Sequence, residues 1–213
     1  MAIAFDAVTD VAGTNTLAHT CTGANLVVFC CAFHDPTAGT ITTATYGGVA
    51  MTELTRITQG VNIEVVVYYK AGPLTGAQNF VTAGTHTTPD LTAVSYTGAS
   101  QTGIPDASAS TTATASTSIS QAITTIGDNS WQFAFLRCQG FSPTATGTPA
   151  TLRTGGGGTG GNYFDSNAAL TPAGSRTASF TASSTNWALI TASFAPPGAA
   201  VTAKYLTLLG VGN

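Results

Sequence analysis

The stretch that decides the fold is Leu26-Val-Val-Phe-Cys-Cys-Ala-Phe33, in which every side chain is apolar. A strand buried on one face alternates apolar and polar residues, whereas a strand buried on both faces is apolar throughout. The stretch also has about the length of one strand. It therefore predicts a central strand, covered on both sides, at the heart of one sheet.

Strand signals recur along the rest of the chain and are separated by turn residues. No segment has the apolar spacing of an amphipathic helix. The expected strands are residues 3–8, 40–46, 49–54, 62–70, 79–82, 92–96, 131–138, 177–182 and 187–194. We therefore predict an all-β fold, a single jelly-roll-like β-sandwich with a C-terminal extension strand.

Two long segments differ from these regular strands. Residues 107–120 are almost wholly alanine, serine and threonine, with little apolar bulk, so we expect an exposed edge strand or an extended loop. Residues 141–176 contain several prolines and the run GGGGTGG at residues 155–161. This composition predicts a long surface loop, and loops of that length often carry function.

The end of the chain is set apart by prolines and a glycine. We expect the sandwich domain at residues 1–195, a linker at residues 196–200 and a C-terminal strand or tail at residues 201–213. Residues 201–209 have strand propensity, so they either fold back as an edge strand of their own sandwich or add to a sheet of a neighbouring copy. In the second case the candidate assembly contacts are Val201, Tyr205, Leu206, Leu208 and Leu209.

Charged residues are rare, at 7% of 213 residues with a net charge of −3. Such a surface offers little electrostatic repulsion between copies, which favours self-assembly. The six Lys and Arg residues are scattered and form no basic stripe, so we expect no nucleic acid partner. No stretch is long and apolar enough to suggest a membrane partner, and the first residues lack the pattern of a classical signal peptide.

The sequence lacks the motifs of two common classes of hydrolase. A nucleophile elbow needs Gly-x-Ser-x-Gly at a strand-to-helix turn, and neither the motif nor the helix is found. A glycosidase needs two carboxylates that face each other across a cleft. Acidic residues are few, and Glu64 is expected to be a solvated residue on the outer face of its strand. We therefore expect a protein that is not an enzyme and has no catalytic residues.

Candidate metal sites can be judged by comparing the spacing of possible ligands with that of known metal-binding motifs. The sharpest zinc candidates are His19, Cys21, Cys30, Cys31 and His34, but they match no standard zinc motif. Adjacent cysteines on a strand also point to opposite faces. Candidates for a loop calcium are Asp35, Asp90, Asp106, Asp128 and Asp165, which lack the Asp-x-Asp-x-Asp spacing. We expect buried free thiols, no metal and no cofactor.

One candidate ligand site lies next to the glycine run. Tyr163, Phe164 and Asp165, with Asn167 nearby, could form a platform for glycans, because aromatic faces and polar side chains suit polyols. The alternative is that these aromatic rings pack back on the sandwich.

Several short motifs together resemble a known kind of module. They are TYGGVAMT at residues 45–52, Tyr68-Tyr69 ahead of PLTG at residues 73–76, SYTG at residues 95–98, and residues 187–196. They are similar to a jelly-roll or β-sandwich module of phage virion or fibre proteins and of bacterial surface proteins. The resemblance implies a fold and a structural or adhesive setting, and it assigns no active residue.

These observations lead to an expectation about function. We expect a structural subunit of a multi-copy assembly, a phage virion or fibre component or an extracellular filament protomer, whose C-terminal strand can be donated to a neighbouring subunit. Its partners are then copies of itself or other virion proteins, and its location is the virion or the extracellular space. The alternative is a carbohydrate-binding or adhesin module that uses the loop at residues 141–176.

Overall fold

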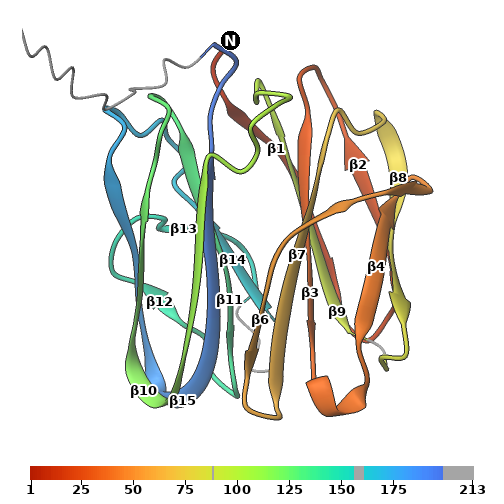
Figure 1. Cartoon of the computed structure of the whole chain (residues 1–213), viewed down its shortest axis with the longest axis vertical. Coiled ribbons are helices and arrows are strands. Elements are labelled where there is room, and N and C mark those ends of the chain that lie inside the picture. The colour runs from red at the N-terminus through yellow and green to blue at the C-terminus, as the bar shows by residue number, and fades with distance from the viewer. Residues whose placement is uncertain (88, 156–160, 199–213) are drawn as a thin grey trace, which may run out of the picture.

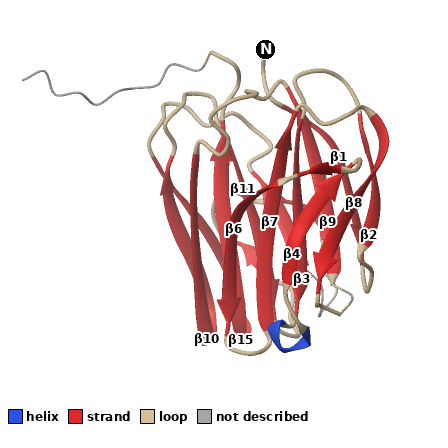
Figure 2. Ribbon diagram, turned by 45° about the vertical axis from the view of Figure 1, so that its right-hand side comes forward, coloured by secondary structure: helices blue, strands red, loops and turns tan. Residues whose placement is uncertain are grey.

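The computed structural model describes residues 1–87, 89–155 and 161–198 (Figure 1). The described chain forms an all-β sandwich in which the only helical element is the short 3-10 helix η1 (Pro36–Ala38), drawn in blue in Figure 2. Within this part of the chain, no helix is long and apolar enough to cross a membrane. The predicted all-β sandwich class is confirmed, and the predicted C-terminal extension strand lies outside the described residues.

The central sheet has five strands in the order β1-β9-β3-β7-β6, and every pair is antiparallel. Their bounds are β1 (Ala4–Val11), β9 (Asp90–Thr97), β3 (Val27–His34), β7 (Ile63–Ala71) and β6 (Thr52–Gln59). All residues of β3 are buried. The apolar stretch at residues 26–33 is therefore the central strand that it predicts, with sheets packed on both of its faces.

One face of the central sheet is covered by a four-stranded sheet with the order β2-β8-β4-β5. Its strands are β2 (Thr16–Cys21), β8 (Gly76–Gly84), β4 (Ile41–Tyr46) and β5 (Val49–Ala50). Tyr46 and Phe80 of this sheet pack against Val28, Cys30 and Ala32 of β3, and all five are buried. This layer lies on the right in Figure 1.

The other face packs on a six-stranded sheet with the order β10-β15-β11-β14-β13, to which β12 adds beside β15. The strands are β10 (Ala107–Thr124), β11 (Trp131–Cys138), β12 (Thr144–Ala145), β13 (Thr151–Thr154), β14 (Gly161–Asp165) and β15 (Ser175–Phe194). Aromatic rings fill this interface: the rings of Phe29 and Phe133 are 4.4 Å apart, and those of Phe29 and Phe194 are 5.2 Å apart. Burial of such large side chains provides the main stabilisation of the core.

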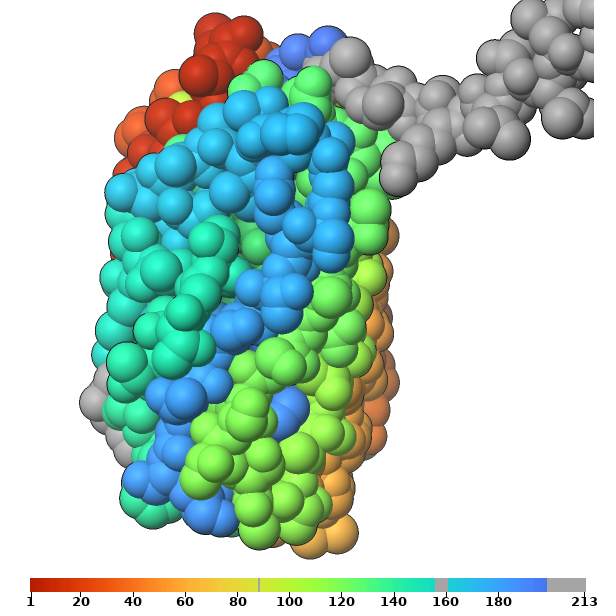
Figure 3. All heavy atoms as spheres, turned by 90° about the vertical axis from the view of Figure 1, so that its left-hand side faces the viewer, coloured from red at the N-terminus to blue at the C-terminus, as the bar shows by residue number. Residues whose placement is uncertain are grey.

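The long hairpin of β10 and β15 folds back over the six-stranded sheet. Its register is interrupted between Ala113 and Ser118, and bulges of this kind bend a strand. Beyond the bulge, Ile119 and Phe180 pack on the far side of the same sheet, where the rings of Phe180 and Phe164 are 4.8 Å apart. The hairpin thus adds an outer layer, at the left of Figure 1 and facing the viewer in Figure 3.

The structure corrects four details of the predicted strands. Residues 141–176 do not form one long loop, since they contain β12, β13 and β14. Residues 177–182 and 187–194 belong to the single strand β15, and β2 lies where no strand was predicted. Residues 49–54 are divided between β5 and β6, so the chain crosses there from one sheet to another. Residues 107–120 form an edge strand, as one of the two predictions for them stated.

Candidate functional site

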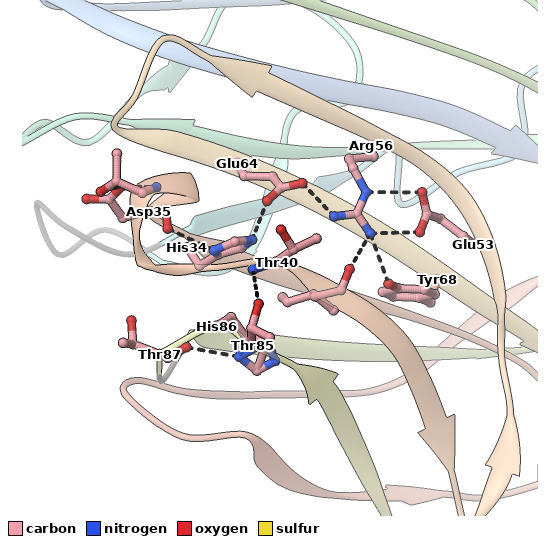
Figure 4. A network of polar contacts seen from close by, with 12 residues as sticks. His34, Asp35, Thr40, Glu53, Arg56, Glu64, Tyr68, Thr85, His86 and Thr87 are labelled. Atoms are coloured by element: carbon pink, nitrogen blue, oxygen red, sulfur yellow. Dashed lines mark hydrogen bonds and ion pairs between the residues drawn. The ribbon is translucent and has the colours of Figure 1, made fainter.

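A network of charged groups lies at one end of the central sheet (Figure 4). The carboxylate of Glu64 lies 2.6 Å from Arg56 Nη1 and 2.5 Å from His34 Nε2. Arg56 also donates to Glu53 at 2.9 Å and to the carbonyl of Ile41 at 2.8 Å. Burial alone would lower the pKa of Arg56, but the two carboxylates outweigh it and raise this pKa. The network ties β3, β4, β6 and β7 together.

The prediction that Glu64 is solvated is wrong. Glu64 and His34 are both buried, because the second face of β7 lies beneath the four-stranded sheet. The sequence does carry a signal for this, since Glu64 is followed by the apolar run of residues 65–67, and a charge that is buried with such a run needs a partner. Arg56 and His34, which supply the partners, come from two other strands. The pairing suits a structural role, since both buried groups are already engaged.

A second polar cluster joins β1, β2 and β9. The Ser95 hydroxyl donates to Asp6 at 2.6 Å and lies 3.0 Å from His19 Nε2, while His19 Nδ1 lies 2.9 Å from the Thr9 hydroxyl. A catalytic triad needs the carboxylate on the histidine, whereas here it is on the serine. Ser95 is also fully buried. The cluster therefore has the residue types of a triad without its geometry.

The third cluster contains two of the predicted ligand residues. The Tyr96 hydroxyl donates to Asp165 at 2.7 Å and also contacts the hydroxyl of Tyr163. Arg153 Nε donates to Asp165 at 2.9 Å, and its guanidinium carbon lies 4.0 Å from the centre of the Phe5 ring. Burial raises the pKa of both tyrosines. The cluster fastens β13 and β14 to the central sheet.

The prediction of a ligand loop at Tyr163, Phe164 and Asp165 is wrong in its placement. All three residues lie on β14 and are buried, with Tyr163 and Phe164 on opposite faces in two different cores. The alternative, in which the rings pack on the sandwich, is the one observed. Their side chains are therefore engaged inside the fold, and the reason for a glycan platform at residues 141–176 is removed.

The candidate zinc ligands do not converge on one site: Cys21 and Cys30 share one core, and Cys31 lies in another. All four cysteines are free and buried, as predicted, and Cys30 and Cys31 point into opposite cores. Cys21 Sγ lies 3.1 Å from the Tyr46 hydroxyl. Among the described residues, no group of three or more His, Cys, Asp and Glu side chains is arranged to hold a metal ion.

The aspartates proposed for calcium have local structural partners. Asp35 caps η1 through Thr37, and Asp90 accepts from the backbone of Gly13. Asp106 accepts from the backbone of Ile126 and Gly127. Asp128 accepts from the backbone of Ala173 at 2.6 Å, and Asp165 belongs to the tyrosine cluster. These carboxylates thus serve to hold turns and loops.

Two cavities lie where the described chain ends. One, of about 560 Å³, is lined by Met1, Ala2, Ile3, Asn129, Trp131, Ala168, Ala169 and Pro196. The other, of about 420 Å³, is lined by Ser100, Thr102, Gly103, Pro105, Asp106, Ile126, Gly127, Ala195, Pro196 and Gly198. The candidate assembly contacts Val201, Tyr205, Leu206, Leu208 and Leu209 lie outside the described residues.

The two outer layers of the sandwich present uncharged surfaces. The four-stranded sheet contains no Asp, Glu, Lys or Arg, and its exposed side chains include Thr16, Ala18, Thr20, Thr43, Ala77, Asn79 and Ala83. On the opposite side, the outer part of the β10/β15 hairpin exposes Ser118, Ser120, Ala122, Thr124, Ser175, Thr177 and Thr181. Figure 3 shows β10 and β15 side by side across this second face. Both faces are candidate contact surfaces, because small uncharged side chains allow close approach.

The comparisons with known proteins give no family. No family model matches the chain, and no match was found among curated proteins or among solved structures.

Proposed function

We propose that this protein is a non-enzymatic structural subunit that packs with copies of itself in a multi-copy assembly. The observation that supports this most is the pair of uncharged faces on opposite sides of the layered domain. A protein surface normally carries many charges, which keep copies apart in solution. Faces of threonine, serine and alanine lack this repulsion, and two sheets can pack at about 10 Å.

The two faces differ from each other, and this difference determines how neighbouring copies are expected to contact each other. Contact between the four-stranded sheet of one copy and the outer hairpin of the next is a heterologous contact. Such contacts repeat from copy to copy and produce a ring or an open filament. A virion or an extracellular filament, the setting suggested by the resemblance, is the corresponding proposal for location, with copies of the chain or other virion proteins as partners.

The polar clusters support the same proposal. Each resembles a reactive constellation in its residue types, but each has its key groups buried and paired with neighbouring strands. Such pairing holds layers together and engages the buried groups Glu64, Ser95 and Asp165 with neighbouring strands, so they are not free to act on a substrate.

Electron microscopy and sedimentation velocity of the full chain at rising concentration test the proposal. We expect ordered polymers or rings for the natural sequence, and their loss in Thr20→Lys/Asn79→Lys, which places charges on the four-stranded face. The matched control is Val61→Lys, which adds a charge at an exposed turn (61% exposed) away from both faces. The proposal fails if the natural chain remains monomeric throughout, or if the charged-face variant, folded by circular dichroism, assembles as the control does.

A further inference from the structure

The outer part of β10, residues 118–124, is a sheet edge without the usual protection. Natural edges carry charged residues or proline, which hinder pairing with another strand. The edge strand β1 carries Asp6 and Asp10, and the short edge strand β13 includes Arg153. Residues 118–124 contain neither charge nor proline, and their ladder with β15 is regular. Among the described residues, β10 pairs with no strand other than β15, which leaves this edge open to an added strand.

The backbone groups that point out from this edge can be identified. Thr125, directly after β10, donates its amide to the carbonyl of Gly174 at 2.9 Å and therefore faces β15. Residues of an antiparallel strand face its two sides alternately. The residues that face away from β15 are thus the even-numbered ones, Ser118, Ser120, Ala122 and Thr124. In agreement, the carbonyls of Ser118 and Ala122 accept hydrogen bonds from side chains of β10 itself, at 3.0 and 2.9 Å.

The sequence of this edge has the same pattern in both directions. Residues 118–124 read Ser-Ile-Ser-Gln-Ala-Ile-Thr, in which a small residue, an isoleucine and a small residue stand on each side of Gln121. Two copies that pair antiparallel about Gln121 therefore place isoleucine beside isoleucine and small residues beside small residues. The same register sets Ser120 opposite Ala122 of the second copy, and both of these residues face outward.

Charge also favours a second copy of this edge as the occupant. Antiparallel pairing about Gln121 brings no charged side chains together, because residues 118–124 contain none. The same kind of self-pairing at β1, about Val8, would set Asp6 beside Asp10 of the second copy, and like charges opposite each other destabilise a strand pair. The outer part of β10 is therefore suited to pair with itself.

We propose that two copies of this protein pair through residues 118–124 of β10, antiparallel and related by a twofold axis at Gln121. Ladder hydrogen bonds between the outward backbone groups supply the affinity. Ile119 and Ile123, which are buried under the outer layer, continue as one apolar row across the axis. Interfaces of this small size are weak, so the pair should form at high concentration and dissociate on dilution. The four-stranded face takes no part, and the proposal does not depend on the proposed function.

Cysteine cross-linking of the full chain tests the register. Gln121 faces β15, so it forms a non-hydrogen-bonded pair with Gln121 of the second copy, in which the Cα atoms are about 4.5 Å apart. This distance allows a disulfide, and we expect Gln121→Cys to give a covalent dimer on mild oxidation. The matched control is Ser118→Cys on the same strand, whose two copies would be about 20 Å apart and should stay monomeric. The natural cysteines are buried and should not cross-link.

Sedimentation equilibrium of the chain with its natural cysteines measures the pairing itself. Ala122→Pro removes an outward amide without breaking the ladder to β15, and we expect it to raise the dimer dissociation constant at least about tenfold. Ala122→Val keeps this amide and should leave the dissociation constant close to that of the natural sequence. Circular dichroism checks that both variants are folded.

Two outcomes would overturn the proposal. Equal cross-linking of Gln121→Cys and Ser118→Cys, or none in either, means that the edges do not pair in this register. Equal dimerisation of Ala122→Pro and Ala122→Val means that the outward amide takes no part. Addition of Thr20→Lys/Asn79→Lys to Gln121→Cys should leave the cross-link unchanged, which separates a failure of the edge pairing from a failure of the face contacts.

Discussion

Glu64 shows how a single residue can couple several strands. Its carboxylate is held between Arg56 and His34, and its side chain is only 6% exposed. Removal of one member of a buried ion pair leaves the other charges without compensation and commonly costs about 3 to 5 kcal/mol. We expect Glu64→Gln to lower the free energy of unfolding by an amount in this range, measured by urea denaturation.

Glu53 provides the matched control for this substitution. It pairs with the same arginine, but its side chain is 39% exposed, and exposed pairs contribute at most about 1 kcal/mol. Glu53→Gln should therefore lower the free energy of unfolding by no more than this. Equal losses in the two variants would show that burial does not set the cost at Glu64.

His19 makes the stability of the fold depend on pH. Burial disfavours the charged imidazole more than the nearby Asp6 carboxylate favours it, and the pKa of His19 is lowered to about 4. Below the ordinary pKa of about 6.5 the unfolded chain binds a proton that the folded chain excludes. The contribution of His19 to the free energy of unfolding is therefore fully present above pH 6.5. It falls as the pH drops towards 4 and does not change further below that pH.

The expected loss between pH 6.5 and pH 4 is roughly 3 kcal/mol. Urea unfolding of the natural chain at pH 7, 6, 5 and 4 measures it, and His19→Gln, which cannot take up a proton, should show a flatter dependence over this range. The same slope in both proteins would assign the pH dependence to other groups.

At the scale of the element, the central strand could be predicted from sequence because its signal is local. The apolar stretch at residues 26–33 needs only its own composition to indicate burial on both faces. β14 could not be found this way, since its first residue belongs to a glycine run that is typical of a loop. Tyr163 and Asp165 reach their partners only through contacts with β9 and β13, and no local pattern specifies those contacts.

Gly161 explains how a glycine-rich segment can enter the core. A Cβ at this position would lie 1.9 Å from the ring of Phe33, so only glycine lets β14 approach the central sheet this closely. We expect Gly161→Ala to destabilise the fold by about 1 to 3 kcal/mol or more, because the well-packed core must shift. Thermal denaturation measures the change.

Gly174→Ala is the control for this substitution, because a Cβ at Gly174 meets no atom within 4 Å and its backbone needs no positive φ. It should change stability by less than about 0.5 kcal/mol, as is usual for surface positions. If Gly161→Ala were tolerated as well as Gly174→Ala, the close approach of Phe33 would not constrain β14.

At the scale of the whole molecule, the distribution of charge separates the inside from the outer layers. The ion pairs of Arg56 and Arg153 involve strands of the central sheet or contacts to it, whereas the four-stranded sheet and the outer part of the β10/β15 hairpin expose mainly hydroxyls and methyl groups. The low fraction of charged residues could be read from the sequence, and its arrangement in layers could not, because the order of the sheets depends on pairings between distant strands. This arrangement has a consequence for how copies interact.

Contacts between uncharged faces should be insensitive to salt. The range of electrostatic interactions falls from about 10 Å at 0.1 M salt to about 3 Å at 1 M, so contacts that depend on ion pairs weaken over this range. Burial of methyl groups is not weakened by screening, and sulfate strengthens it. We expect sedimentation velocity of the full chain to give the same assembly in 0.1 M and 1 M sodium chloride, and more assembly in sodium sulfate. Dissociation in 1 M sodium chloride would instead place the contacts on the charged loops and edges, and would contradict the role proposed for the two outer faces.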